Sequence, residues 1–240
     1  MAELCTFSLA ARCPETGMLG VAVASRFLAV GALCPHVAAG VGAVATQALV
    51  NPLLGFDALE LLRQGQSATA VLTRLIAADE GRELRQLAVV DAAGGAAAHT
   101  GSRCVEWAGH RTGAGYAAAG NMLTGPEVLE AMERAFLVAE KAPFPWRLVA
   151  ALEAGQAAGG DKRGKQAAAL LVADRQPYPY VYLRVDDHPE PILELKRLLE
   201  LSDRTYAPYR ELLPTRERPS GVTDPEAIAR ARAAASRSAP

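Results

Sequence analysis

The dipeptide Cys5-Thr6 stands close to the start of the chain and opens the segment CTFSLAAR, in which small or polar residues alternate with apolar ones. Such alternation is typical of a β-strand. A thiol and a hydroxyl can both attack a carbonyl carbon. The first strand of a hairpin is an unusual place for this chemistry unless the terminus of the chain takes part in it. The alternative is that both are ordinary strand residues, because threonine favours strands and cysteine is readily buried.

Polar residues also close the next two strand-like segments. Ser25 and Arg26 end MLGVAVASRF, whereas Thr46 and Gln47 lie near the end of GVGAVATQAL, and Asn51 begins the turn that follows. Side chains of these types can donate hydrogen bonds to an oxyanion or bind a polar substrate. The alternative is local structure, namely an Asn-Pro turn and hydrogen bonds at the ends of strands.

The segment AHTGSRCVEWAGHRTG contains His99, Thr100, His110 and Arg111 around a glycine-rich loop. Loops of this kind often carry binding groups, so His99 and Thr100 are candidate substrate contacts. The spacing of the two histidines is not a recognised ligand spacing, and we predict no metal site. A structural role in hydrogen bonding is the alternative.

Two further segments carry candidate binding residues. Asn121 precedes a predicted helix whose free N–H groups favour an anion such as a substrate carboxylate. Asp161 and Arg163, in GGDKRGKQ, can form an ion pair at the rim of a pocket or clamp a carboxylate. The alternative for this second segment is a solvated turn.

The elements that must position these residues follow from the period of the apolar pattern. In order, the chain predicts three strands, two helices, three strands, two helices, two strands and a last helix from about Pro189 to Tyr209. Ser67 is a predicted N-cap, and Thr124 with Glu127 a predicted capping box. Strands in blocks indicate antiparallel hairpins, and helices in pairs indicate layers outside the sheets. The pattern therefore predicts an α+β fold, a four-layer αββα sandwich of two antiparallel sheets, with a single-sheet α+β fold as the alternative. We expect one domain over residues 1–212 and a poorly ordered tail over 213–240.

Composition excludes several classes of protein. The 240 residues carry a formal net charge of −1, which argues against a nucleic-acid partner. No apolar run is long enough to span a membrane and no secretory signal is recognisable, so we expect a cytoplasmic protein without a membrane partner. The cysteines show no C-x-x-C spacing and are interpreted as reduced, buried side chains. We predict no cofactor. Alanine-rich helices such as ALEAGQAAG suit close helix contacts, and a homo-oligomer is expected.

Six separated segments together resemble the bacterial and archaeal family called domain of unknown function 1028 (DUF1028), over about Thr6 to Leu201. The family is similar to the Ntn-hydrolase-like superfamily, which implies the αββα sandwich and a mechanistic hypothesis but no substrate. The segments are TFSLAARCPETGMLGVAVASRFLAVGA, GVGAVATQALVNPLLG, GRELRQLAVVD, AAHTGSRCVEWAGHRTGAGYAAAGNMLTGPEV, GGDKRGKQAAALLV and YVYLRVDDHPEPILEL.

The resemblance implies chemistry at the first residue of a mature chain. In an Ntn hydrolase the side chain of that residue attacks a carbonyl, and its own α-amine, with a pKa of about 7.7–8.0, takes the proton. Thr6 matches the threonine that opens this family's first strand, and Arg26 can supply the cation that lowers the pKa of the amine. In this chain MAEL and Cys5 precede Thr6, so the chemistry requires a cut at Leu4-Cys5 or Cys5-Thr6.

Three hypotheses of function follow. The first is an Ntn-type hydrolase of an amide or peptide-like C–N bond in a small polar substrate, with Thr6, or Cys5 after an earlier cut, as the nucleophile. The second is a cyclohydrolase-like or non-hydrolytic enzyme that uses a cleft of the same fold. The third is a catalytically silent protein for ligand binding or assembly.

Overall fold

The structure, a computed structural model, describes residues 3–4 and 6–237 of the chain. It divides into two compact units, one that ends at Leu195 and one that begins at Lys196. Cys5 lies outside the described residues, and every other candidate residue belongs to the first unit. The expected boundary between residues 212 and 213 stays a prediction.

The first sheet joins strands β1, β5, β6 and β7 in that order, and β4 also pairs with β5. All of these pairings are antiparallel. The turn of the β6–β7 hairpin contains Gly94 at a φ of 92°, a conformation that glycine adopts without steric cost. The strands are β1 (Glu3–Leu4), β4 (Pro35–Ala38), β5 (Gly42–Leu49), β6 (Arg85–Asp91) and β7 (Ala96–Thr100).

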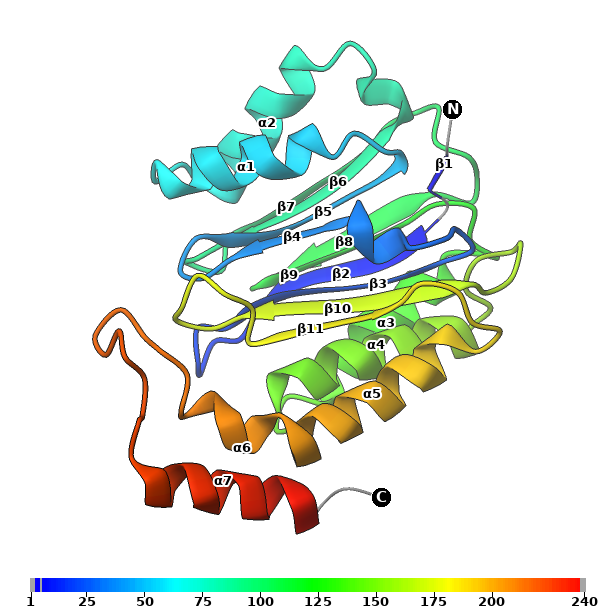
Figure 1. Ribbon diagram of the computed structural model, residues 1–240. Helices are drawn as coiled ribbons and strands as arrows, with labels where there is room; N and C mark the ends of the chain where they lie inside the picture. Colours follow the sequence, from blue (N-terminus) through cyan, green and yellow to red (C-terminus); the bar gives the residue numbers. More distant parts are fainter. Residues whose placement is uncertain (1–2, 5, 238–240) are drawn as a thin grey trace. The chain divides into compact units, whose positions relative to one another are not determined.

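The second sheet has the order β11, β10, β3, β2, β9 and β8, and it too is antiparallel throughout. Strand β2, which Thr6 opens, therefore lies inside the sheet between β3 and β9 (Figure 1). The strands are β2 (Thr6–Arg12), β3 (Leu19–Ser25), β8 (Gly109–Gly113), β9 (Tyr116–Gly120), β10 (Ala167–Ala173) and β11 (Val181–Val185). The α+β class with two antiparallel sheets is confirmed, and the single-sheet alternative is wrong.

A core of small side chains fills the space between the two sheets. Val21 and Val23 of β3 pack in one cluster with Ala43 and Ala45 of β5 and with Ala88 of β6, all at most 1% exposed. Side chains alternate between the two faces of a strand, so residues two positions apart share a face. This register determines which polar side chains also point into the space between the sheets.

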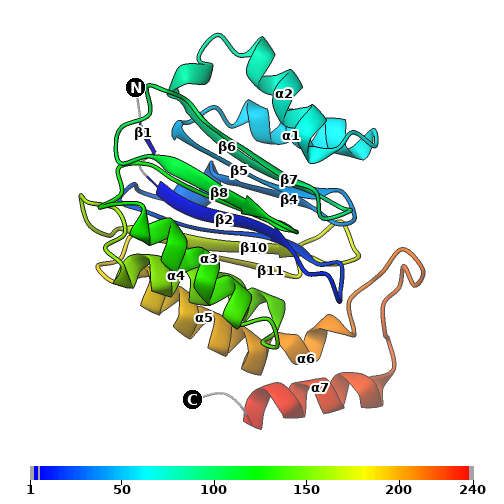
Figure 2. The ribbon, with the colours of Figure 1, turned by 180° about the vertical axis from the view of Figure 1, so that it is seen from behind.

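Helices cover the outer faces of the two sheets (Figures 1 and 2). Helices α1 (Leu53–Arg63) and α2 (Ala68–Ala78) share an apolar cluster with Val44, Leu87 and Val89 of the first sheet. Helices α3 (Glu127–Val138) and α4 (Phe144–Ala157) pack against the second sheet. The Ser67 cap of α2 is confirmed, because its side chain accepts a hydrogen bond from the backbone N–H of Ala70 at 3.3 Å.

Two expectations about local structure are wrong. Helix α3 has Pro126 at its N-cap, and the hydroxyl of Thr124 donates to the carbonyl of Ala158, so there is no capping box. The predicted glycine-rich loop is interrupted by strands, since β7 ends at Thr100 and β8 contains His110. The sequence analysis does not predict strand β4, which is short and begins with Pro35.

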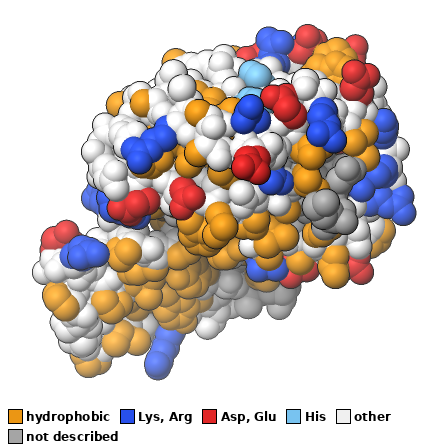
Figure 3. Space-filling view, turned by 90° about the horizontal axis from the view of Figure 1, so that it is seen from above, with side chains coloured by type: hydrophobic (Ala, Val, Ile, Leu, Met, Phe, Trp, Pro, Cys, Tyr) orange, Lys and Arg blue, Asp and Glu red, His pale blue; other side chains and the backbone are white. Residues whose placement is uncertain are grey.

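The C-terminal part of the chain is helical. Helix α5 (Pro191–Thr205) begins in the first unit, while α6 (Ala207–Arg210) and α7 (Pro225–Arg237) belong to the second. Helix α7 lies within the segment for which the sequence predicts a poorly ordered tail. Among the described helices there is none with the length and apolar character that a membrane span needs. On the face drawn in Figure 3, basic and acidic side chains are interspersed with hydrophobic ones.

Candidate functional site

A cluster of polar side chains lies between the two sheets at one end of the apolar core. Its members lie two or four residues along the chain from buried core residues such as Ala10, Val23, Ala45 and Ala88. Their side chains therefore point to the same inward face as the core residues. Each is at most 3% exposed. We call this set the buried polar cluster: Thr6, Ser8, Ser25, Gln47, Gln86 and Asn121.

Thr6 is held from both neighbouring strands. Its side chain is fully buried, and its hydroxyl donates to the hydroxyl of Ser25, its register partner in β3, at 3.3 Å. The backbone carbonyl of Thr6 accepts hydrogen bonds from the backbone N–H of Asn121 at 3.0 Å and from Nε2 of Gln47 at 3.5 Å. The start of β2 therefore has a fixed position relative to both sheets.

Gln86 is the centre of the cluster. Its Oε1 accepts hydrogen bonds from Nε2 of Gln47 at 2.6 Å and from Nδ2 of Asn121 at 3.0 Å. Its Nε2 donates to the carbonyl of Gly120 at 2.8 Å and to the hydroxyl of Thr100 at 2.9 Å. Gln86 was not among the predicted site residues. The available signal was a polar residue at an inward position of the otherwise apolar strand RQLAVVD.

Ser8 is the other member that the sequence analysis missed. Its hydroxyl donates to Oε1 of Gln47 at 2.7 Å, and both side chains are buried. The carboxamide of Gln47 thus bonds to Ser8 through its oxygen and to Gln86 through its nitrogen. Because a buried polar group without a partner is costly, these bonds fix the orientation of the amide that faces Thr6.

Two residues that follow the cluster amides have a left-handed backbone. Ala48, directly after Gln47, has a φ of 66°, and Met122, directly after Asn121, has a φ of 52°. Residues other than glycine adopt this conformation at a cost of about 1–3 kcal/mol, and such positions gather at functional sites. Ala48 lies in β5 of the first sheet, and Met122 lies in the segment that follows β9 of the second sheet.

A second group of candidate residues meets at the end of β3. The carboxylate of Asp161 is buried, with 1% of its side chain exposed, and it accepts hydrogen bonds from the backbone N–H of Arg26 at 3.1 Å and from Nη2 of Arg163 at 2.8 Å. The guanidinium of Arg26 donates to the carbonyl of Arg163. Asp161 forms a β-bridge with Leu123, two residues after Asn121, so the group adjoins the buried polar cluster.

Three predicted residues have local or peripheral roles. The hydroxyl of Thr46 donates to the backbone carbonyl of Asn51 at 3.1 Å, and Oδ1 of Asn51 accepts from the N–H of Leu53 at 3.2 Å. Both bonds shape the turn into α1, and the alternation of β5 turns Thr46 away from the side of Gln47. His99 bonds through Nε2 to the carbonyl of Arg82 at 2.9 Å.

Thr100 connects the cluster to His110 of β8, an exposed residue. Its hydroxyl lies 2.9 Å from Nδ1 of His110 and also accepts from Gln86. Desolvation of the imidazole lowers the pKa of His110, and the nearby charge of His99 lowers it further. Among the described residues, there is no group of three or more His, Cys, Asp or Glu side chains arranged to hold a metal ion.

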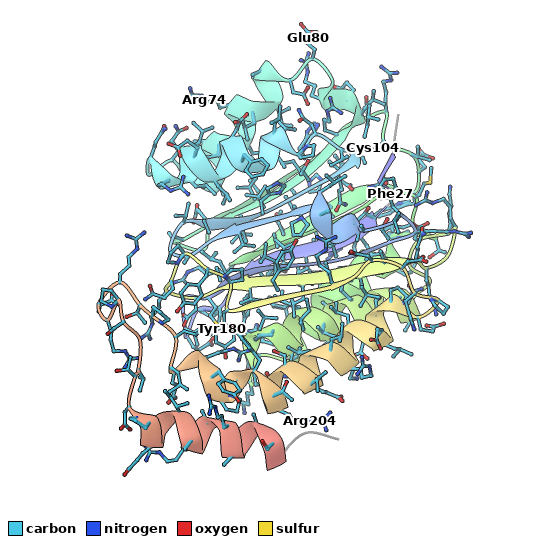
Figure 4. The ribbon with its side chains drawn as sticks, viewed as in Figure 1. Phe27, Arg74, Glu80, Cys104, Tyr180 and Arg204 are labelled. Carbon is cyan, nitrogen blue, oxygen red and sulfur yellow. The ribbon has the colours of Figure 1, made fainter. Side chains whose placement is uncertain are left out.

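A small pocket opens beside the buried polar cluster. Asn121 lines it together with Ala48 and Leu49 of β5 and with Cys104 and Val105 of the segment between β7 and β8. Cys104 is labelled in Figure 4, close to the end of β5. The pocket thus adjoins Thr6 through Asn121, whose backbone N–H bonds to the Thr6 carbonyl.

The cluster can supply a nucleophile and hydrogen-bond donors. The hydroxyl of Thr6 is an alcohol that can attack a carbonyl, and the amide of Asn121 can stabilise negative charge on oxygen. Within the described part of the chain, the partner of the Thr6 hydroxyl is Ser25, and a serine hydroxyl is no base at neutral pH. A base for Thr6 must therefore come from elsewhere, and its own amine is such a group once it is freed.

Comparisons with known proteins agree on one family. The model of the family of unknown function DUF1028 matches residues 6–195. The crystal structure of the DUF1028 protein SPO2555 from Silicibacter pomeroyi is 36% identical, with a TM-score of 0.84, over 92% of this chain and 100% of that one. Anbu (ancestral beta-subunit) from Yersinia bercovieri is 14% identical over 80% of this chain and 92% of that one, and its TM-score of 0.36 is too low to support an argument. No curated protein matches the chain.

Proposed function

Because the chain belongs to the DUF1028 family, whose function is unknown, we propose an activity from its own site: Ntn-type hydrolysis of an amide or peptide-like C–N bond in a small polar substrate. Thr6 is the nucleophile after the residues before it have been removed. One observation carries the proposal. The Thr6 hydroxyl lies at the start of an interior strand, 3.3 Å from Ser25, among buried amides that can donate hydrogen bonds.

The proposed fold is the four-layer αββα sandwich of the Ntn-hydrolase-like superfamily. Three features support it: two antiparallel sheets, a shared core of small residues between them, and helix pairs packed against each sheet. In such a sandwich the first residue of an interior strand lies at the edge of the space between the sheets, where a substrate can approach it.

The proposed reaction begins when the freed α-amine of Thr6 takes the proton from its own hydroxyl. Oγ1 then attacks the substrate carbonyl, and the resulting oxyanion accepts a hydrogen bond from the side-chain amide of Asn121. The C–N bond breaks, the proton passes from the α-amine to the leaving amine, and an ester to Thr6 remains. Water hydrolyses this ester, which releases the acid and restores the hydroxyl.

The unprocessed chain is expected to be inactive for two reasons. The nitrogen of Thr6 is part of an amide, which is not a base, and the side chain has no exposed surface. Removal of the preceding residues overcomes both obstacles, because it creates the α-amine that acts as the base and uncovers the hydroxyl. A cut one residue earlier would instead make Cys5 the nucleophile.

The residues around Asp161 have a supporting electrostatic role in this proposal. The buried carboxylate orients the backbone of Arg26 and the side chain of Arg163 next to the start of β2. The positive charge of the two arginines favours the neutral form of a nearby amine and so lowers its pKa. Ser25, in contact with the Thr6 hydroxyl, is suited to pass the proton between hydroxyl and amine.

Release of amine from a library of short peptides and amides tests this function. We expect Thr6→Ala to abolish turnover and Thr6→Ser to retain part of it, because serine keeps the hydroxyl. Thr46→Ala is the matched control, since Thr46 is equally buried but bonds to the turn at Asn51. Turnover that survives Thr6→Ala would rule out Thr6 as the nucleophile.

A further inference from the structure

One edge of β5 is divided between two partner strands. Strand β4 covers the first part, with Pro35 opposite Ala45. Strand β1 covers the end, with Glu3 opposite Leu49 and Leu4 opposite Ala48. The other edge of β5 pairs with β6 from Gly42 to Ala48. Without β1, Ala48 and Leu49 would have no strand partner on this side.

Leu4 belongs to the first sheet and Thr6 to the second, so the chain changes sheets between these two residues. The proposed cleavage falls within the same short stretch of sequence. Figure 1 shows β1 beside the end of β5 and the start of β2. Glu3 and Leu4 run antiparallel to β5.

The end of β5 is fixed independently of β1. The guanidinium of Arg85, in β6, donates to the carbonyl of Leu49, and its Nε lies 2.9 Å from a carboxylate oxygen of Asp79. Ala48 keeps its left-handed backbone at the same point. Because this edge is already ordered, the protein loses little conformational entropy there when a ligand binds.

We propose that the edge of β5 at Ala48–Leu49 binds the acyl half of an extended peptide substrate, in the place that Glu3–Leu4 occupy. The inference rests on the proposed function and narrows its small polar substrate to a short peptide recognised through its main chain. Recognition of this kind adds one strand to the exposed edge of a sheet, and main-chain hydrogen bonds supply much of the affinity.

We place the acyl half of the substrate where Glu3–Leu4 lie because the same oxygen of Thr6 performs both cleavages. In self-cleavage, Oγ1 of Thr6 attacks the carbonyl of Cys5, the C–N bond breaks, and the acyl group that passes to oxygen carries Glu3–Leu4. In substrate cleavage, the same oxygen attacks a carbonyl whose acyl group extends in the same direction from Thr6. In both cases the proton lost by the hydroxyl goes to the departing nitrogen, and water later hydrolyses the ester.

The pocket beside this edge gives the substrate side chains a partner. Ala48 and Leu49 line it directly, and the rest of its wall includes the apolar side chains of Cys104 and Val105 and the charged side chain of Arg103. Because side chains of a strand alternate, one residue of a docked peptide points toward the pocket and its neighbours point away.

Binding can be measured without turnover in the full-length Thr6→Ala chain, which lacks the nucleophile. In this background, Glu3→Pro with Leu4→Pro removes two backbone N–H groups and opposes strand pairing. Glu3→Ala with Leu4→Ala is the matched control, because it keeps both N–H groups. The probe is a fluorescein-labelled Ala-Glu-Leu amide that copies residues 2–4, together with a version methylated on its backbone nitrogens.

We expect the proline variant to bind the probe at least about tenfold more tightly than the alanine variant, because an attached strand competes at a high effective concentration. The methylated probe should bind neither. Slower hydrogen exchange at residues 48–49 when the probe is added to the proline variant would support the same edge. Circular dichroism establishes that both variants are folded.

Equal affinity of the two variants for the probe, or equal binding of the methylated probe, would overturn the inference. These outcomes are independent of catalysis. If amine release depends on Thr6 but the probe does not bind, the proposed hydrolysis is supported and peptide binding at the edge of β5 is rejected. If the probe binds but hydrolysis does not depend on Thr6, peptide binding is supported and the role of Thr6 as nucleophile is rejected.

Discussion

The side chains of Gln47 and Gln86 meet in the space between the sheets, where Nε2 of Gln47 lies 2.6 Å from Oε1 of Gln86. The two residues are register partners in β5 and β6 of the first sheet. The same oxygen of Gln86 also accepts from Asn121, which follows β9 of the second sheet. This pair of amides therefore couples the two sheets at the end where Thr6 opens β2.

Replacement of Gln86 should destabilise the protein strongly. Gln86→Leu leaves the amide groups of Gln47 and Asn121 without their acceptor in a buried place, and we expect a loss of about 2–4 kcal/mol in the free energy of unfolding. Urea unfolding followed by circular dichroism measures it. Gln64→Leu, at an exposed position, is the control and should change the value by less than about 0.5 kcal/mol. Equal effects would show that the Gln86 bonds contribute nothing to stability.

The aspartate–arginine pairs Asp161–Arg163 and Asp186–Arg184 offer a matched test of burial. Both join residues two positions apart at 2.8 Å, but the side chain of Asp161 is 1% exposed and that of Asp186 is 49% exposed. We expect Asp161→Asn to cost about 1–3 kcal/mol, because a buried charged acceptor is lost. Asp186→Asn should cost at most about 1 kcal/mol. Thermal unfolding of the two variants compares them, and a larger loss for Asp186→Asn would contradict the assignment.

The free energy of unfolding should fall in mild acid because the imidazole of His36 is buried. Burial lowers the pKa of His36, against the opposing effect of its bond to the Cys34 carbonyl. The unfolded chain then binds more protons than the folded one, so stability is fully present above the unfolded pKa of about 6.5 and is lost as the pH falls toward the folded value. Urea midpoints at pH 8 and pH 5.5 measure the loss. His36→Gln should show a smaller decrease than the native chain, and an identical decrease would exclude His36 as a cause.

The left-handed backbone of Ala48 predicts an unusual response to glycine. Ala48→Gly should raise the free energy of unfolding by up to about 1 kcal/mol, because glycine adopts a positive φ without steric cost. Ala43→Gly, in the same strand but without a positive φ, should lower it by about 1 kcal/mol or more. Thermal unfolding distinguishes the two signs. If both substitutions lower the free energy of unfolding, the left-handed backbone of Ala48 carries no steric cost that glycine relieves.

The regular strands were accessible from the sequence because their cause is local. Alternation in TFSLAAR and LGVAVAS predicted β2 and β3, and the same rule identifies the inward positions of Thr6, Ser8 and Ser25. Strand β8 was not predicted because its sequence, GHRTG, is polar and largely exposed at the edge of its sheet. An edge strand with little burial leaves a weak hydrophobic pattern.

The site was predicted only in pieces. Ser25, Gln47, Asn121 and Asp161 were each singled out, but their sequence separations gave no means of joining them. Gln86 joins two of them, Gln47 and Asn121, which lie 39 and 35 residues away along the chain. Such contacts depend on which strands face each other across the core, and this follows from the topology of both sheets rather than from any local pattern.

The intact mass of the purified chain, read before and after incubation at neutral pH, tests the central claim most directly. The account predicts that the native chain converts to a form beginning at Thr6, and that this form hydrolyses amides. It predicts that Thr6→Ala stays at its initial mass under the same conditions. A native chain that keeps the residues before Thr6 and still hydrolyses amides would contradict the account.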